Sequence, residues 1–169
     1  GFTAVNLNKL LDASIEMVSY KIKIKEVDFH RNFNGKVPAI KGNFTQLQEV
    51  LFNIIDNSYD AIIQRKEELK EAAFRGSIEF YAKTLDPERL ELVIKDNGMG
   101  VKDDNKRKIF TPFFTTKLSS KKGTGLGMYV IKQIIEENHN GKVEFSSEYK
   151  QGSMTRILLP IYPPHMNKS

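Results

Sequence analysis

Hydrophobic positions recur along this chain with two different periods, and the changes between them predict the order of its elements. The first apolar set has helical spacing and comprises Leu7, Leu10, Leu11, Ile15 and Val18. It predicts a helix over residues 7–20. Apolar and polar residues then alternate in 22–24 and 27–29, which indicates strand.

A second, longer helix is predicted after Gly42. Asn43, followed three residues later by Gln46, resembles a capping box, in which two side chains satisfy free backbone N–H groups at a helix start. The apolar positions that continue in helical register are Leu47, Val50, Leu51, Ile54, Ala61 and Ile62. We expect this helix to run through the charged stretch that ends at Glu71.

The rest of the pattern predicts two hairpins and a third helix. These elements are the hairpin of 77–84 with 89–95, the helix 126–138 stopped by Gly141, and the hairpin of 142–149 with 153–159. Helices and strands in this mixed order predict a two-layer α/β sandwich with a mostly antiparallel sheet. We expect one domain over residues 1–169, with a tail from about 161. The loop 96–125 is long for a compact domain, and such loops are usually functional.

Composition narrows the classes of protein that this fold can serve. The chain has 169 residues, which suits one domain, and no cysteine, which excludes disulfides and thiolate metal sites. Its apolar runs are too short to cross a bilayer, so we expect no direct membrane contact. The net charge is +5, and lysines gather in 102–122. That stretch fits either a solvated basic loop or a surface that attracts polyanions.

A line of polar residues follows the second predicted helix. Its members are Glu49, Asn53, Asn57 and Asp60, spaced by four, four and three residues. This spacing places all of them on one face of a helix, with apolar residues on both sides. Amide oxygens are hard ligands that suit Mg²⁺. The alternative is an ordinary solvent-facing polar stripe.

Two glycine motifs and a group of phenylalanines carry the other candidate chemistry. Asp96-Asn97-Gly98-Met99-Gly100 follows a strand, where a carboxylate can accept a hydrogen bond from an exocyclic amine, although a plain turn would have similar residues. The run 123–128 leads glycines into a helix, which favours bound phosphates, or else forms a flexible linker. The run 109–117 combines three phenylalanines with Lys117, which can reach a phosphate, while the rings can serve as a local core.

Taken in this order, the four segments resemble the N, G1, F and G2 boxes of the ATP-binding domain of sensor histidine kinases. The resemblance extends from about Val5 to Pro160. It implies the Bergerat fold that this family shares with gyrase, mismatch-repair and heat-shock chaperone ATPases, with a mixed sheet on three helices and a long ATP lid. The form Pro-Phe-Phe-Thr-Thr-Lys at 112–117 resembles a subgroup that includes nitrogen-regulation sensors.

The resemblance also implies roles for individual residues. Asn57 would coordinate Mg²⁺ with help from Asn53, which together with Lys117 would also act in catalysis. Asp96 would bind the adenine amino group of ATP, with Thr155 close by. The other residues implied in nucleotide binding are Asp60, Gly98, Gly100, Phe110, Thr116, Gly123, Thr124, Gly125, Leu126 and Gly127.

One position separates a kinase from a hydrolase. Gyrase-like ATPases carry a glutamate four residues before the metal-binding asparagine, where this chain has Asn53, and an amide cannot act as a general base. Glu49 is the fallback base. Ser58 and Asp60 depart from the common kinase pattern, and Asp60 resembles the hydrolase branch. A gyrase-like or chaperone-like ATPase, and an anti-sigma-type serine kinase or regulatory nucleotide-binding module, therefore stay open as alternatives.

The expected acceptor histidine is missing. His30, His139 and His165 lie outside any dimerising helical hairpin, so we expect surface or capping roles for them. A kinase would therefore need a dimerisation and phosphoacceptor domain elsewhere in a longer protein, before Gly1. The resemblance implies that domain and a response regulator as partners, a homodimeric parent protein, a cytoplasmic location with any inner-membrane anchor on another part, and no nucleic acid.

Overall fold

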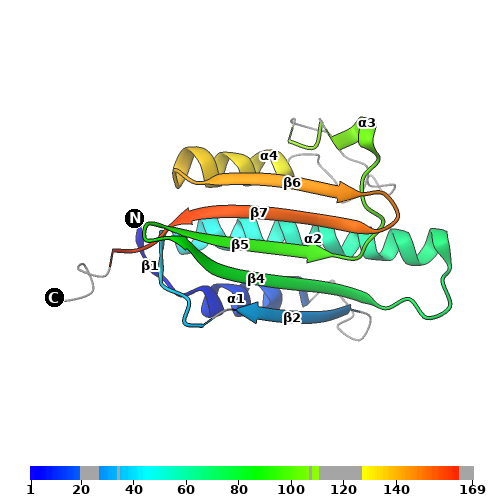
Figure 1. Cartoon of the computed structure of the whole chain (residues 1–169), viewed down its shortest axis with the longest axis horizontal. Helices are drawn as coiled ribbons and strands as arrows, with labels where there is room; N and C mark the ends of the chain where they lie inside the picture. Colours follow the sequence, from blue (N-terminus) through cyan, green and yellow to red (C-terminus); the bar gives the residue numbers. More distant parts are fainter. Residues whose placement is uncertain (20–26, 34, 107, 111–126, 164–169) are drawn as a thin grey trace.

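The computed structural model describes residues 1–19, 27–33, 35–106, 108–110 and 127–163. Helices lie against one face of a five-stranded sheet (Figure 1). The helices are α1 (Leu7–Ser19), α2 (Phe44–Leu69), α3 (Asp103–Lys106), α4 (Gly127–Lys132) and the π-helix η2 (Gln133–Asn138). The strands are β1 (Thr3–Val5), β2 (Val27–Phe33), β3 (Ile40–Gly42), β4 (Gly76–Asp86), β5 (Arg89–Asp96), β6 (Lys142–Glu148) and β7 (Gly152–Pro160).

The main sheet has the strand order β2-β4-β5-β7-β6. β2 pairs with β4 in parallel, and the other three pairs are antiparallel. This arrangement confirms the predicted two-layer sandwich with a mostly antiparallel sheet. β1 and β3 form a separate two-stranded antiparallel sheet, which was not predicted because each has only one large apolar residue, Val5 or Ile40, and therefore shows no alternation.

The buried side of β5 consists of apolar residues and ends at a charged residue. Leu90, Leu92 and Ile94 are buried, and Asp96 is the next residue of the same alternating set. All of them share the face that packs on the helices, because every second residue of a strand points to the same side. β5 therefore ends by placing a carboxylate in the interior.

The start of α2 differs from the predicted capping box in one respect. The Asn43 side chain accepts the backbone N–H of Gln46 at 2.9 Å, as predicted. The reciprocal bond is absent, because the Asn43 backbone N–H donates to Nε2 of His139 at 3.0 Å instead. Oε1 of Gln46 is buried without a hydrogen-bond partner among the described residues. The helix ends at Leu69, two residues earlier than predicted.

The third predicted helix forms, but not as one regular α-helix. It starts as α4 and continues as the π-helix η2 to Asn138. The helix was expected to stop at Gly141, but the left-handed residue that follows it is Asn140, with a φ of 52°. His139 is only 1% exposed, so the expected surface role is wrong for this residue. Its capping role is confirmed at the start of α2, whereas His30 is exposed on β2.

The predicted tail begins later than residue 161. Ile161 forms a bridge with Ile40 and donates its backbone N–H to Glu88, and Tyr162 donates to the carbonyl of Ala39 at 2.8 Å. These contacts tie the end of the described chain to β3. Among the described residues, no helix combines the length and apolar character that a membrane span requires.

Candidate functional site

The polar line of α2 faces the start of α4. Glu49 is exposed, whereas Asn53, Asn57 and Asp60 are half-buried. A Cβ atom built on Gly127 would lie 3.7 Å from Nδ2 of Asn57 and 3.8 Å from Oδ1 of Asn53. The fold therefore brings the two predicted metal-binding amides beside the last glycine of the predicted phosphate-binding motif. The simple solvent-facing stripe does not describe this geometry.

Asp96 is a buried carboxylate with defined partners. It is 7% exposed, its Oδ1 accepts the backbone N–H of Gly98 at 2.9 Å, and its Oδ2 accepts the hydroxyl of Ser58 at 2.8 Å. Burial raises the pKa of Asp96 to about 6, against the opposing effect of these hydrogen bonds and one from the Ser153 backbone. The carboxyl group is thus oriented, and a further donor would stabilise its ionised form.

Ser58 is a site residue that sequence reasoning did not select. It appeared only as a departure from the common family pattern, directly after Asn57. In the structure it is 5% exposed and bonded to Asp96, which lies 38 residues away in the chain. The only hint in the sequence was that a small residue with a hydroxyl group follows the predicted metal-binding asparagine. The partner could not be found without the packing of α2 on β5.

The loop after Asp96 packs directly on α2. The Met99 backbone N–H donates to the carbonyl of Ala61 at 2.8 Å, and a Cβ on Gly98 would lie only 2.6 Å from the Cβ of Ala61. Gly100 has a φ of 74°, and a Cβ there would collide with the carbonyl of Glu148. Both glycines are therefore needed for the close approach of this loop to its neighbours. Their contact with an adenine ring stays a prediction.

Thr155 lies on the same side of the sheet as Asp96. It pairs with Ile94 across β5 and β7, as Ser153 pairs with Asp96, and cross-strand partners share a face. Thr155 is 5% exposed, so its hydroxyl lies at the interior face near the buried carboxylate. The structure thus brings Asp96 and Thr155 together, as the resemblance implied.

The remaining predicted residues are distributed differently. Phe110 is half-buried against the core, and Nζ of Lys132 lies 5.5 Å from the centroid of its ring, so it serves the local packing that was one of its two interpretations. The rest lie outside the described residues, and these are Thr116, Lys117, Gly123, Thr124, Gly125 and Leu126.

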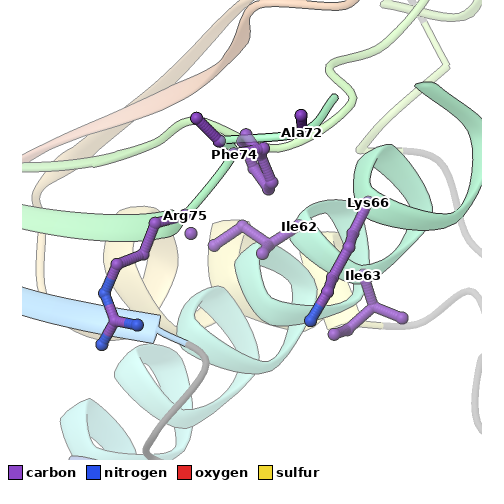
Figure 2. Close-up of a pocket in the computed structure, with 8 residues that line it drawn as sticks. Ile62, Ile63, Lys66, Ala72, Phe74 and Arg75 are labelled. Atoms are coloured by element: carbon purple, nitrogen blue, oxygen red, sulfur yellow. The ribbon is translucent and has the colours of Figure 1, made fainter. Parts of the chain in front are cut away.

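A surface pocket of about 280 Å³ occurs elsewhere, beside the C-terminal half of α2 (Figure 2). Ile62, Ile63 and Lys66 line it from the helix, and residues 72–76 line it from the following loop. None of the predicted site residues belongs to it. We therefore rest the candidate site on Asp96 and the polar line, where buried and oriented polar groups meet, and not on this pocket.

Mg²⁺ fits the donors at the polar line. Within the described residues, no group of three or more His, Cys, Asp or Glu side chains is placed to hold a metal ion. Oδ1 of Asn53 and Nδ2 of Asn57 lie near Gly127, so the amide of Asn57 would have to turn over to present its oxygen to a metal. Amide oxygens suit Mg²⁺, which keeps several waters and binds phosphates. A metal held here would depend on phosphate oxygens for the rest of its coordination.

Comparison with known proteins agrees with the site. Residues 42–163 match the model of the histidine kinase-, DNA gyrase B-, and HSP90-like ATPase family. The chain belongs to this family, and within it the chain is an ATP-binding domain of the histidine kinase type. The assignment to the histidine kinase type, and not to the gyrase-like members of the family, rests on the curated relatives and the solved structures that the chain matches.

Those relatives are sensor kinases. The sensor histidine kinase ZraS of Salmonella typhi is 32% identical over 158 residues, which are 94% of this chain and 31% of that protein. The kinase AtoS of Escherichia coli (strain K12) is 31% identical over 94% of this chain and 24% of its own length. The chain therefore spans less than a third of these curated relatives. Nothing in the comparisons selects the nitrogen-regulation subgroup, which stays a prediction.

The fold is also that of a solved kinase domain. The catalytic domain of histidine kinase ThkA, in a nucleotide-free form, matches with a TM-score of 0.73 and 27% identity, over 95% of this chain and 98% of that chain. The full-length kinase ShkA in complex with AMPPNP has a TM-score of 0.76 over 95% of this chain and 31% of its own, but at 22% identity it shows the fold alone.

Proposed function

We propose that this domain binds Mg·ATP and transfers the γ-phosphate to a histidine on a separate dimerisation domain of the same protein. One observation carries the proposal. Asn57 and Ser58 are consecutive residues of α2, and the first faces Gly127 while the second holds the carboxylate of Asp96. Neighbouring residues of one helix thus serve two ends of an extended ligand, a base at Asp96 and phosphates at Gly127.

At the base end, Asp96 acts as a hydrogen-bond acceptor. Its ionised carboxylate would take the exocyclic amine of adenine, while Ser58 and Gly98 keep the group oriented. Thr155 would add a hydrogen bond from the same face of the sheet. A guanine base carries a carbonyl where adenine has this amine, and two facing acceptors repel. The arrangement therefore favours ATP over GTP.

At the phosphate end, the work is positioning and charge neutralisation. Bound Mg²⁺ would supply positive charge to the phosphates. Asn57 would hold the metal with help from Asn53, the backbone of 123–127 would surround the phosphates, and Lys117 would reach the γ-phosphate. Phosphoryl transfer needs little more from a protein than this placement.

Transfer to a protein acceptor is favoured over hydrolysis by one residue. Asn53 occupies the position from which a glutamate would activate water, and an amide cannot accept that proton. Glu49, the fallback base, is exposed one turn earlier on α2. We therefore expect slow hydrolysis by this domain alone. Steady ATP turnover by the isolated domain would favour the gyrase-like alternative.

The partners follow from the same proposal. A domain without its own acceptor would work with a dimerisation and phosphoacceptor domain in a homodimeric, cytoplasmic assembly, and a response regulator would receive the phosphate. A structure of histidine kinase ThkA in complex with the response regulator TrrA provides a precedent for that last partner in this fold.

The first test is titration calorimetry with a non-hydrolysable ATP analogue. Wild type and Asp96→Asn would be titrated with and without Mg²⁺, and GTP would be the control ligand. Metal-assisted binding of the ATP analogue that the substitution abolishes supports the proposal. If neither form binds, the nucleotide site is wrong. Transfer of labelled phosphate to a histidine, in a longer protein that includes the acceptor domain, then tests the kinase step.

A further inference from the structure

Arg65, near the end of α2, joins three separate segments of the chain. Its Nη1 donates to the backbone carbonyls of Asn97, at 3.1 Å, and Gln151, at 3.0 Å. Its Nε and Nη2 donate to the two carboxylate oxygens of Glu71, at 2.9 and 3.2 Å. The guanidinium carbon also lies 4.8 Å from the centroid of the Phe74 ring. The planar group thus engages most of its N–H donors and one of its faces.

The environment of Arg65 makes these contacts strong. Its side chain is 13% exposed, against 29–55% for Arg31, Arg75, Arg89 and Arg156, which also form ion pairs. Hydrogen bonds from a charged group gain strength when water is largely excluded. The partnership with Glu71 lowers the pKa of that carboxyl, chiefly through the side-chain hydrogen bond. The carboxyl group of Glu71 is therefore charged at neutral pH.

The two carbonyls that Arg65 holds both lie just beyond Asp96, where β5 ends. Asn97 is the next residue in the chain and begins the loop that packs on α2. Gln151 belongs to the β6–β7 turn and lies two residues before Ser153, which pairs with Asp96 across the sheet. The Lys150 backbone N–H also donates to the carbonyl of Met99 at 2.5 Å, so the turn and the loop are linked directly.

One face of α2 makes all of these attachments. Ser58, Ala61 and Arg65 are spaced by three and four residues, so they lie on the same side of the helix. The Ser58 hydroxyl donates to the carboxylate of Asp96, and the Ala61 carbonyl accepts the N–H of Met99. Arg65 donates to the carbonyl of Asn97. Arg65 is the only one of the three that also reaches the β6–β7 turn.

We propose that Arg65 is a positioning residue of the adenine pocket. It holds the loop 97–100 and the β6–β7 turn in place around Asp96 before nucleotide arrives, although it lies outside the set of residues expected to touch ATP. The inference rests on the proposed ATP-binding function. A preformed pocket saves the ligand the cost of ordering the loop, so losing Arg65 weakens affinity without removing any contact to the nucleotide.

The test compares nucleotide affinities of four proteins by calorimetry. These are wild type, Arg65→Ala, Arg65→Lys and the control Arg31→Ala, which removes an arginine of the edge strand β2 that is bonded to Asn8 and Asp12 of α1. Each is titrated, while folded by circular dichroism, with ADP and with a non-hydrolysable ATP analogue. Hydrogen exchange of the loop amides is measured on the unliganded proteins.

We expect Arg65→Ala to weaken the binding of both ligands about tenfold, because the loop that loses its fixed position surrounds the adenine base, which both ligands have. The ratio of the two affinities stays constant, and Arg31→Ala binds like wild type. Arg65→Lys falls in between, since an ammonium can hold one carbonyl but lacks the planar fork. Amides of residues 98–101 exchange faster in Arg65→Ala than in the control.

Three results would overturn the inference. They are wild-type affinity in Arg65→Ala, a loss confined to the ATP analogue, and unchanged exchange in the loop of the unliganded variant. Failure of the wild-type chain to bind either nucleotide would instead contradict the proposed function. The exchange measurement needs no ligand, so it tests the positioning role in that case too.

Discussion

At the scale of single residues, the site depends on the groups that surround the buried carboxylate of Asp96. Among the described residues, the hydrogen-bond donors to Asp96 are the neutral groups of Ser58 and the backbone of Gly98 and Ser153, and burial outweighs them in setting its pKa. A fixed cation would hold the group ionised but would also compete with the amine of the base. Neutral donors orient the carboxylate and leave its charge for the ligand.

This burial predicts a pH dependence of stability. The folded-state pKa of Asp96 is about 6, above the ordinary 3.8, so the folded protein binds more protons between these values. The contribution of Asp96 to the free energy of unfolding is therefore present at low pH. It falls by about 3 kcal/mol as the pH rises from about 4 to 6. Urea unfolding across this range measures it, and Asp96→Asn should lack that slope.

The control for Asp96 is Asp103→Asn. Lys106 lowers the pKa of the exposed Asp103, chiefly through a side-chain hydrogen bond, so its contribution has the opposite sign, present at neutral pH and lost in acid. Parallel stability curves for wild type and Asp96→Asn would contradict the raised pKa of Asp96.

Ser58→Ala should weaken ATP binding and shift its pH dependence. The hydroxyl bond lowers the pKa of Asp96, so its loss raises that pKa further and moves the midpoint of binding to higher pH. We expect about a tenfold loss of affinity at neutral pH, since hydrogen bonds to charged groups contribute about 1.5–3 kcal/mol. Calorimetry between pH 5 and about 8 measures both effects.

Ser146→Ala on β6 is the matched control, because that serine is exposed. An equal loss of affinity in both variants, or an unmoved midpoint in Ser58→Ala, would remove Ser58 from the site.

At the scale of elements, α2 organises the molecule through its faces and its N-terminus. Its apolar face fills the core, its polar line faces Gly127, and its third face holds the loop after Asp96. Its N-terminus is fixed by His139, whose Nε2 accepts the Asn43 N–H while Nδ1 bonds the carbonyl of Ile134 in η2. That histidine therefore ties the start of α2 to the helix that begins at Gly127.

His139 predicts a second pH effect, with the opposite sign to that of Asp96. Burial lowers the pKa of His139 below its ordinary 6.5, against the opposing effect of its hydrogen bond to the carbonyl of Ile134. Protonation of Nε2 would also remove the acceptor for the Asn43 N–H. The contribution of His139 to the free energy of unfolding is therefore present above pH 6.5. It is lost as the pH falls through the pKa of His139 in the folded protein. His139→Ala should cost about 2–4 kcal/mol in urea unfolding, from the unpaired N–H and the lost packing.

Exposed His30 supplies the control for this measurement. We expect His30→Gln to unfold like wild type and His139→Gln to lose the pH dependence between 5 and about 6.5. If both histidines respond alike, the role of His139 at the helix start is wrong.

At the scale of the whole molecule, distant parts of the chain meet at β3. Val5 of β1 pairs with Ile40, and Ile161 bridges the same residue near the other end of the described chain. Phe2 stacks on His139 with ring centroids 4.6 Å apart. The beginning, middle and end of the domain are thus connected beside the start of α2.

Val5→Ala tests this connection. Val5 is 2% exposed in the core, so truncating it should lower the free energy of unfolding by about 2 kcal/mol. The neighbouring Thr3 is exposed, and Thr3→Ala should change stability by less than about 0.5 kcal/mol. A negligible effect of Val5→Ala in urea unfolding would show that β1 is not part of the cooperative fold.

Periodicity and motif order were sufficient for the main elements and for part of the site. The helical register of α2 placed Asn53 and Asn57 on one line, and the position of Asp96 after an alternating run placed it at a strand end. These properties are local, because side-chain direction along a helix or strand follows from spacing alone. The short strands β1 and β3 were not predicted because each has a single large apolar residue, which defines no period.

The sequence by itself determined the order of elements, the face of α2 that carries its amides, and the kind of chemistry that Asp96 offers. Only the tertiary structure decided the partners of Ser58, Arg65 and His139. These residues bond to groups 38, 32 and 96 positions away in the chain, respectively. No local pattern encodes such pairs, because they depend on which surfaces meet when the helices pack on the sheet.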